Sequence, residues 1–107
     1  MDYINKIELQ GEIGAIRLSN INNMQVASFS LATEFLSKNH LGDIACETTW
    51  HHVCAWEGKN ICDLSLLGKG SKVRVIGRMR TSRYTSVDGN EKTFHEVLAS
   101  ELSIVNE

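Results

Sequence analysis

Both tryptophans of this 107-residue chain lie in one short segment, TTWHHVCAW, residues 48–56. In an extended strand, side chains alternate between two faces, so Trp50 and Trp56 would point to the same side. In a helix, at about 100° per residue, the two rings would lie well apart on the surface. The strand interpretation therefore predicts an aromatic platform, which either packs into a core or stacks on a planar ligand.

A second candidate surface is the basic segment SKVRVIGRMRTSRYT, residues 71–85. Between Lys69 and Tyr84 there are six basic residues and no acidic one, although the net charge of the chain is −2. As a strand, this segment would carry on one face Lys72, Arg74, Ile76, Arg78, Arg80 and Tyr84. Charged runs usually form solvated faces, but such faces commonly mix the two signs. The unbroken run favours a surface that binds a polyanion.

Hydropathy by itself favours a buried tryptophan face. The face with Trp50, Cys54 and Trp56 is more apolar than the face with His51 and Val53. Tryptophan also packs in a core more often than it forms a ligand platform. The residue pattern alone thus points to a core and leaves the ligand interpretation open.

The histidines and cysteines near this segment do not form a catalytic or metal-binding pattern. The three cysteines include no CxxC pair, and His51 and Cys54 fall on opposite faces of one strand. His52 and Cys54 share a face, but two ligands do not make a structural metal site. No motif supplies an activated nucleophile with its oriented partner. We therefore expect free thiols, no metal, no cofactor and no enzymatic activity.

Five strands and one short helix would position these residues. The strands are expected over 5–13, 25–33, 46–57, 71–85 and 93–105. The segments SNINN and SVDGN are turn signals, and Asp-Gly in the second favours a hairpin. Ile61, Leu64 and Leu67 have helical spacing before Gly68, which predicts a helix of about two turns.

This order of elements predicts an all-β fold, a five-stranded OB-fold barrel with one short helix between strands 3 and 4. Glycines inside the first and fourth strands fit the bends of such a barrel. An SH3-like barrel is the main all-β alternative, but it does not usually carry a helix at this place. The length predicts a single domain, residues 1–107.

Composition and the first residues give no sign of a membrane or secreted protein. The chain is 42% apolar and 22% charged, which is typical of a soluble globular protein. Its apolar runs are too short to span a bilayer, and MDYINKIEL lacks the basic and apolar parts of a signal sequence. We expect a cytoplasmic protein with no membrane partner.

Four blocks of the sequence resemble the bacterial single-stranded DNA-binding protein family, in the same order and with the family's spacing. They are NKIELQGEIG, VASFSLAT, TTWHHVCAW and KGSKVRVIGRMRTSRYT with its DGN turn. The resemblance extends from Asn5 to about Val105 and is weakest between Gly14 and Val26, where the family's usual Asp-Pro is missing. It implies single-stranded DNA binding in replication, recombination or repair, and it implies that the tryptophan face is outward.

The resemblance also implies roles for individual residues. Trp50, Trp56 and Tyr84 match family aromatics that stack on bases, and Phe35 is the nearest counterpart of a further one. His52 and Arg80 match basic positions of the motifs, and the arginines of the basic strand would contact phosphates. The implied DNA-binding residues are Trp50, His52, Trp56, Arg74, Arg78, Arg80, Arg83, Tyr84 and Phe35.

The family forms homotetramers through its first strand, and a short primosomal relative forms dimers. The resemblance therefore implies a homo-oligomer, a tetramer or a dimer, with interface residues Lys6, Glu8, Gln10 and His51. Family members usually continue into a Gly-rich linker and an acidic tail, whereas this sequence ends with its last strand. We therefore expect a short form without tail-mediated partners. An alternative is a primosomal-type OB-fold module that binds protein or RNA in replication restart or a mobile element.

Overall fold

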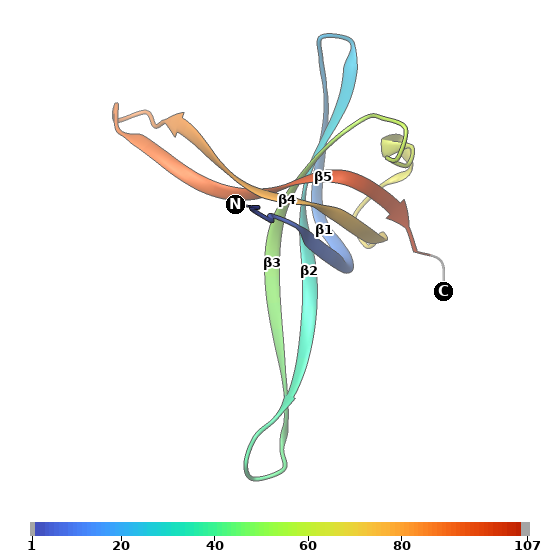
Figure 1. Ribbon diagram of the computed structural model, residues 1–107, viewed down its shortest axis with the longest axis vertical. Coiled ribbons are helices and arrows are strands. Elements are labelled where there is room, and N and C mark those ends of the chain that lie inside the picture. Colours follow the sequence, from blue (N-terminus) through green and yellow to red (C-terminus); the bar gives the residue numbers. More distant parts are fainter. Residues whose placement is uncertain (1, 106–107) are drawn as a thin grey trace.

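Five strands close into a barrel in the computed structural model, which describes residues 2–105 (Figure 1). They are β1 (Ile7–Ile21), β2 (Met24–Lys38), β3 (Ile44–Trp56), β4 (Lys72–Thr85) and β5 (Glu91–Ile104). Their order around the barrel is β1-β2-β3-β5-β4, and β4 pairs with β1 to close it. The expected five-stranded barrel is confirmed. Residues 1, 106 and 107, which complete the predicted domain, lie outside the described residues.

The expected two-turn helix is a single 3-10 turn, Leu64–Leu66. The Asp63 carboxylate caps the turn by accepting the Ser65 N–H at 3.0 Å. Leu64 and Leu67 are buried in the barrel, whereas Ile61 forms a β-bridge with Leu102. The spacing of these apolar residues therefore reflects their contacts with the barrel, and it does not indicate a helix of two turns.

Inward-facing side chains from all five strands make the core. On β3 the buried residues are Val53 and Ala55, so Trp50 and Trp56 lie on the outer face. The preference from hydropathy for a buried tryptophan face is wrong, because Val53 and Ala55 take the inward positions of β3 and strand alternation then turns the tryptophans outward. The core residues are Ile13, Ala27, Phe29, Leu31, Val53, Ala55, Leu64, Leu67, Val73, Val75, Val97 and Leu102.

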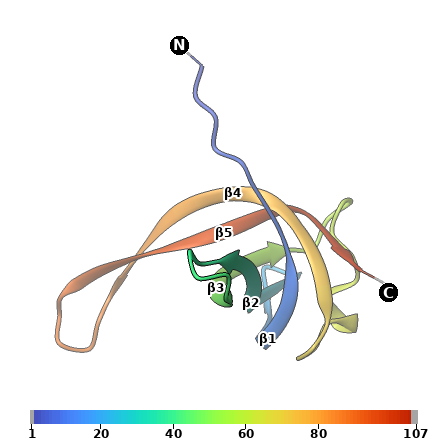
Figure 2. The same ribbon diagram turned by 90° about the horizontal axis from the view of Figure 1, so that it is seen from below.

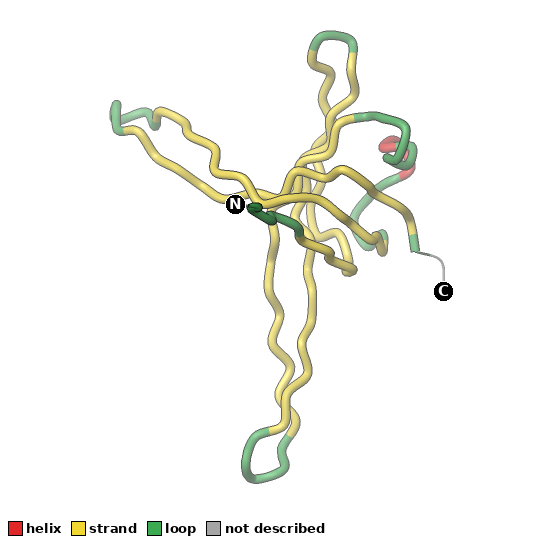
Figure 3. Tube along the Cα trace, in the orientation of Figure 1, coloured by secondary structure: helices red, strands yellow, loops and turns green. Residues whose placement is uncertain are grey.

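Three hairpins extend beyond the barrel: β1–β2, β2–β3 and β4–β5 (Figure 3). The tip of β1–β2 is a two-residue turn in which Asn22 and Asn23 have φ of 52° and 66°. Asparagine tolerates this left-handed region, and the mirror-image turn fits the strand twist. The first three strands run beyond their expected bounds because apolar alternation marks only the part of a strand that covers the core.

Glycines permit the sharp bending of the sheet, in which β4 arches over the barrel (Figure 2). A Cβ on Gly77 would lie 2.1 Å from the carbonyl oxygen of Leu98, beside the bulge at Ile76 and Gly77. A Cβ on Gly11 would lie 2.0 Å from the carbonyl oxygen of Ala32. Both positions therefore mark close backbone approaches, as the two interior glycines of the sequence indicate.

Candidate nucleic-acid interface

An exposed aromatic row crosses the outer faces of β3, β5 and β4. Trp50, His52 and Trp56 share one face of β3, and Trp50 is 60% exposed. The ring of His52 meets that of Phe94 edge-on, with centroids 5.8 Å apart, and Phe94 lies 5.9 Å from the ring of Tyr84. The fold thus brings together aromatic residues from three strands, which we call the aromatic row.

Phe94 is a member of this row that the sequence analysis missed. It is 37% exposed and pairs with Ser82 of β4, which lies two residues before Tyr84 and on the same face of the strand. The signal was present in the fifth strand, because Phe94 alternates out of step with the core residue Val97. An outward phenylalanine beside an outward tyrosine is visible only once β4 and β5 are aligned.

Trp50 is seated on a glycine of β1. Gly14 occupies the bulge in β1 between Ile13 and Ala15, and Trp50 pairs with Ala32 of the intervening strand β2. A Cβ on Gly14 would lie 2.5 Å from Cζ3 of Trp50 and 3.2 Å from Oγ of Ser30. The missing side chain therefore makes room for the indole, which leans across β2 and remains open to solvent.

A buried carboxylate lies beneath the aromatic row. Glu96 is 6% exposed, and its Oε1 accepts hydrogen bonds from Arg80 Nε at 2.7 Å and from Ser82 Oγ at 2.8 Å. His52 Nε2 lies 3.8 Å from Oε2 of the same carboxylate. The guanidinium of Arg80 is thereby held in place through Nε, which leaves its terminal N–H donors to meet a ligand.

The basic strand β4 is balanced by carboxylates from its neighbours. Arg74 pairs with Glu8 of β1 at 2.9 Å, and Arg83 pairs with Glu91 of β5 at 3.5 Å. The hydrogen bond from Arg74 holds the pKa of the Glu8 carboxyl below its usual range. The segment of β4 contains no acidic residue, but the surface around it does, because the sheet places acidic residues of neighbouring strands beside the arginines.

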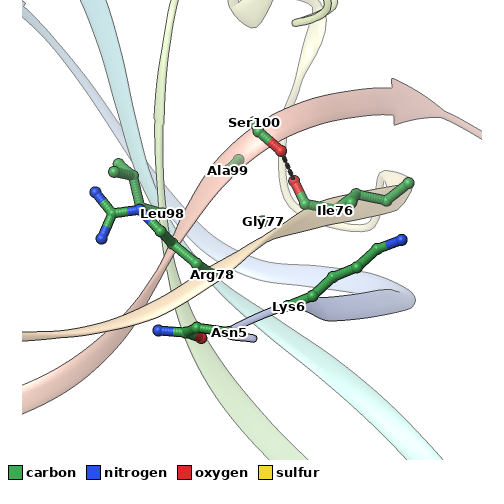
Figure 4. A pocket seen from close by; sticks show the side chains of 8 residues that line it. All are labelled: Asn5, Lys6, Ile76, Gly77, Arg78, Leu98, Ala99 and Ser100. Atoms are coloured by element: carbon green, nitrogen blue, oxygen red, sulfur yellow. Dashed lines mark hydrogen bonds between the residues drawn. The ribbon is translucent and has the colours of Figure 1, made fainter. Parts of the chain in front are cut away.

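Arg78 keeps its charge free of such partners. Within residues 2–105 no ion pair involves Arg78. It lines a groove of about 360 Å³ at the bulge in β5, together with Gly77, Leu98 and the residues labelled in Figure 4. Leu98 pairs with Arg78 on one side and with Cys54 of β3 on the other, so this groove borders the tryptophan face.

Three of the implied DNA-binding residues are not brought to the aromatic row. Phe35 pairs with Glu47, an odd number of positions from the pair of Ala32 and Trp50, so it lies on the opposite face of the β2–β3 hairpin. Arg83 likewise lies on the face of β4 opposite Tyr84. Arg74 lies near the other end of β4, beside Glu8. The face of the row carries Trp50, His52, Trp56, Arg80, Tyr84 and Phe94, and Arg78 borders it in the groove beside Leu98.

The residues expected at an oligomer interface lie away from the row. Lys6, Glu8 and Gln10 alternate along the first strand and the residue before it. In the described part of the chain, the stretch 7–11 is paired with β4 alone. His51 is half-buried on the face opposite the tryptophans, with its Nε2 2.8 Å from Oγ1 of Thr33. Among the described residues, one edge of the stretch 7–11 is therefore not paired with a strand.

The cysteines are free thiols, and their surroundings favour the protonated form. Burial raises the pKa of the Cys54 thiol and that of Cys62. Among residues 2–105, no group of three or more His, Cys, Asp or Glu side chains is placed to hold a metal ion. In the same range, no helix is long and apolar enough to cross a membrane.

Comparison with known proteins gives a consistent picture. A family model described as "Single-strand binding protein family" matches residues 4–105. The single-stranded DNA-binding protein of Xanthomonas campestris is 32% identical over 104 residues, which are 95% of this chain and 60% of that protein. The mitochondrial single-stranded DNA-binding protein of Drosophila melanogaster is 31% identical over 102 residues, covering 92% of this chain and 69% of the relative.

Two solved structures resemble this fold. One is described as "Plasmodium falciparum SSB complex with ssDNA"; it is 25% identical, has a TM-score of 0.73 and covers 99% of this chain and 98% of that one. The other is a deletion mutant of the single-stranded DNA binding protein from Thermus aquaticus, 20% identical, with a TM-score of 0.77. It covers 96% of this chain and 51% of that one, and it supports the fold. The chain spans 60% and 58% of the length of the single-stranded DNA-binding proteins of Xanthomonas campestris and Xanthomonas axonopodis.

Proposed function

The chain belongs to the single-strand binding protein family, and on that premise we propose that it binds single-stranded DNA with little regard to sequence. The observation that carries the proposal is the aromatic row, in which ring systems from β3, β5 and β4 lie on one exposed face. We place this binding in DNA replication, recombination or repair in the cytoplasm, on the ground of family membership. No bond is made or broken, so the activity is binding and not catalysis.

Stacking explains why such a surface selects single strands. Every base has a π-face, so a stacked base contributes about 1–3 kcal/mol whatever its identity. In a duplex these faces are hidden between neighbouring base pairs. Trp50, with most of its indole exposed, is the principal stacking residue, and Phe94 and Tyr84 extend the platform across β5 and β4.

Phosphate contacts come from the arginines nearest the row. Arg78 has no carboxylate partner in the described residues, and Arg80 is held by Glu96 with its terminal nitrogens available. Each such contact releases counterions, so two contacts give a slope of about −1.4 in a plot of log affinity against log salt. Arg74 and Arg83 contribute less, since each is paired with a carboxylate and lies off the row.

The proposal is tested by an anisotropy titration of a labelled oligothymidylate at several salt concentrations. We expect binding that unlabelled single strands of mixed sequence displace and that a duplex of equal length does not. We also expect binding to persist in part at high salt, because stacking does not depend on ionic strength. Equal competition by duplex and single strand would contradict the proposal and would indicate a purely electrostatic surface.

The seat of Trp50 gives a prediction about Gly14. The substitution Gly14→Ala places a Cβ against the indole ring, so the ring must move out of its position over β1. We expect the affinity for oligothymidylate to fall several-fold. The measurement is a double-mutant cycle with Trp50→Ala, in which Gly14→Ala has no further effect once the indole is gone. Gly68→Ala is the matched control, since nothing lies within 4 Å of a Cβ there. If Gly14→Ala lowers the affinity by the same factor in the Trp50→Ala background, its effect arises from a change in the barrel and not from displacement of the indole.

A homo-oligomer, a tetramer or otherwise a dimer, is part of the proposal. The support is the edge of β1 over residues 7–11, which no strand in residues 2–105 covers, together with the alternation of Lys6, Glu8 and Gln10 along it. An edge of this kind invites pairing with another chain unless it is covered. His51 is proposed to lie near the same contact. Native mass spectrometry at micromolar concentration reports the state, and a monomer there would refute it.

A further inference from the structure

A second groove lies on the other side of the tryptophan face, between β1 and β2. Its volume is about 330 Å³, and its lining includes Arg17, Ser28, Ser30 and His52. We propose that this groove binds a phosphate of the nucleic acid strand whose base stacks on Trp50. The inference rests on the proposed function and adds to it a subsite that neither the basic strand nor the resemblance assigned.

The sheet register places Arg17 at the end of a row that crosses the whole face. Arg17 pairs with Ser28, Ser28 with Cys54, Cys54 with Leu98, and Leu98 with Arg78. Paired residues share a face, so this row runs across all five strands on the outside of the barrel. Four steps of about 4.8 Å give a path of about 19 Å along the curved sheet from Arg17 to Arg78. An arginine thus stands in a groove at each end, with the tryptophan face between them.

The polar groups of the groove are suited to an anion. Ser30 Oγ accepts the N–H of Ala15 at 3.0 Å, which leaves its own O–H to donate. Ser28 Oγ and His52 Nε2 lie 3.3 Å apart, so a second hydroxyl and an imidazole border the same space. A guanidinium with two hydroxyls beside it matches the oxygens of a phosphodiester.

The charge of Arg17 has no carboxylate partner in the part of the chain that the structure describes. Within residues 2–105 it forms no ion pair, whereas Arg74, Arg80 and Arg83 each have a carboxylate partner. No carboxylate lines the groove itself. Arg17 therefore resembles Arg78 in having no carboxylate partner among residues 2–105, and it lies in β1, away from the basic run.

The groove is next to the seat of Trp50. Ser30 contributes to both, because it lines the groove and also lies 3.2 Å from the position of a Cβ on Gly14, beneath the indole. A base stacked on Trp50 therefore carries its sugar and phosphate to the rim where Arg17 stands. The strand would then cross β2 and β3 toward the groove of Arg78.

The test is the salt dependence of oligothymidylate binding by Arg17→Ala and Arg17→Lys. For Arg17→Ala we expect a several-fold loss of affinity at low salt, and a slope of log affinity against log salt smaller in magnitude by about 0.7, as one lost phosphate contact requires. Arg17→Lys keeps the charge and should keep the slope. Lys59→Ala is the control for loss of a positive charge, because Lys59 is an exposed loop residue that does not line this groove.

Two results would overturn the inference. If Arg17→Ala keeps the wild-type affinity and slope while Trp50→Ala weakens binding, the subsite is wrong and the proposed function stands. If Arg17→Ala loses affinity with an unchanged slope, the contact is not to a phosphate. Absence of binding by the wild-type protein would instead refute the proposed function itself, so the two failures are distinguishable.

Discussion

Replacing Trp50 by alanine is expected to weaken the binding of oligothymidylate by about 5- to 150-fold. This range corresponds to the loss of one stacked base, about 1–3 kcal/mol. The indole is 60% exposed and lies outside the core, so the free energy of unfolding should fall by no more than about 1–2 kcal/mol. The measurement is the dissociation constant by anisotropy, with thermal unfolding of the same samples as the check on folding.

Two further variants sharpen this prediction. Trp50→Phe keeps a ring for stacking and should retain much of the affinity. Phe35→Ala removes an aromatic side chain that is 67% exposed on the same hairpin but on its other face. The register predicts a smaller loss there than at Trp50, whereas the resemblance implies a comparable one. Equal losses of affinity in Phe35→Ala and Trp50→Ala would contradict the proposal that only the tryptophan face of the hairpin binds bases.

The second large effect is expected on stability. Glu96→Gln removes the buried charge that holds Arg80 and Ser82, and we expect the free energy of unfolding to fall by about 2–4 kcal/mol. Breaking a buried ion pair from one side costs about 3–5 kcal/mol, and the 35% exposure of the Arg80 side chain reduces that loss. Urea denaturation with the slope held constant measures the change.

The matched control for this variant is Glu91→Gln. Glu91 pairs with Arg83 on the same two strands, but both side chains are more than half exposed, at 62% and 73%. Exposed pairs contribute about 0–1 kcal/mol, so Glu91→Gln should be nearly neutral. A loss at Glu96 no larger than the loss at Glu91 would show that the buried carboxylate does not organise the platform.

The fold was predictable because its signals are local. Alternation of apolar residues located the five strands, and the Asp-Gly turn located the last hairpin, whose Gly89 has a φ of 86°. The helix was overestimated because Leu64 and Leu67 are spaced by their contacts with the barrel and not by helical turns. Apolar spacing over one or two turns does not separate a helix from a short turn packed on a sheet.

The site was only partly predictable because it is built across strands. Hydropathy placed Trp50 and Trp56 in the core, and only the resemblance turned them outward. No acidic residue lies near Arg80 in the sequence, so its partner Glu96, which lies on the neighbouring strand β5, was not predicted. Phe94 and Arg17 were missed for the same reason. Each is placed on the binding face by the register of its strand with the neighbouring strand, which the sequence alone does not give.

The central claim is that the aromatic row stacks on bases, and the most direct test is quenching of tryptophan fluorescence by oligothymidylate. Both tryptophans lie on the proposed binding face, and Trp50 is largely exposed. We predict strong quenching that survives in part at high salt, that duplex DNA does not reproduce, and that is mostly lost in Trp50→Phe. An unchanged emission spectrum at low salt, with oligothymidylate in excess, would contradict the account and would mean that this face meets some other partner.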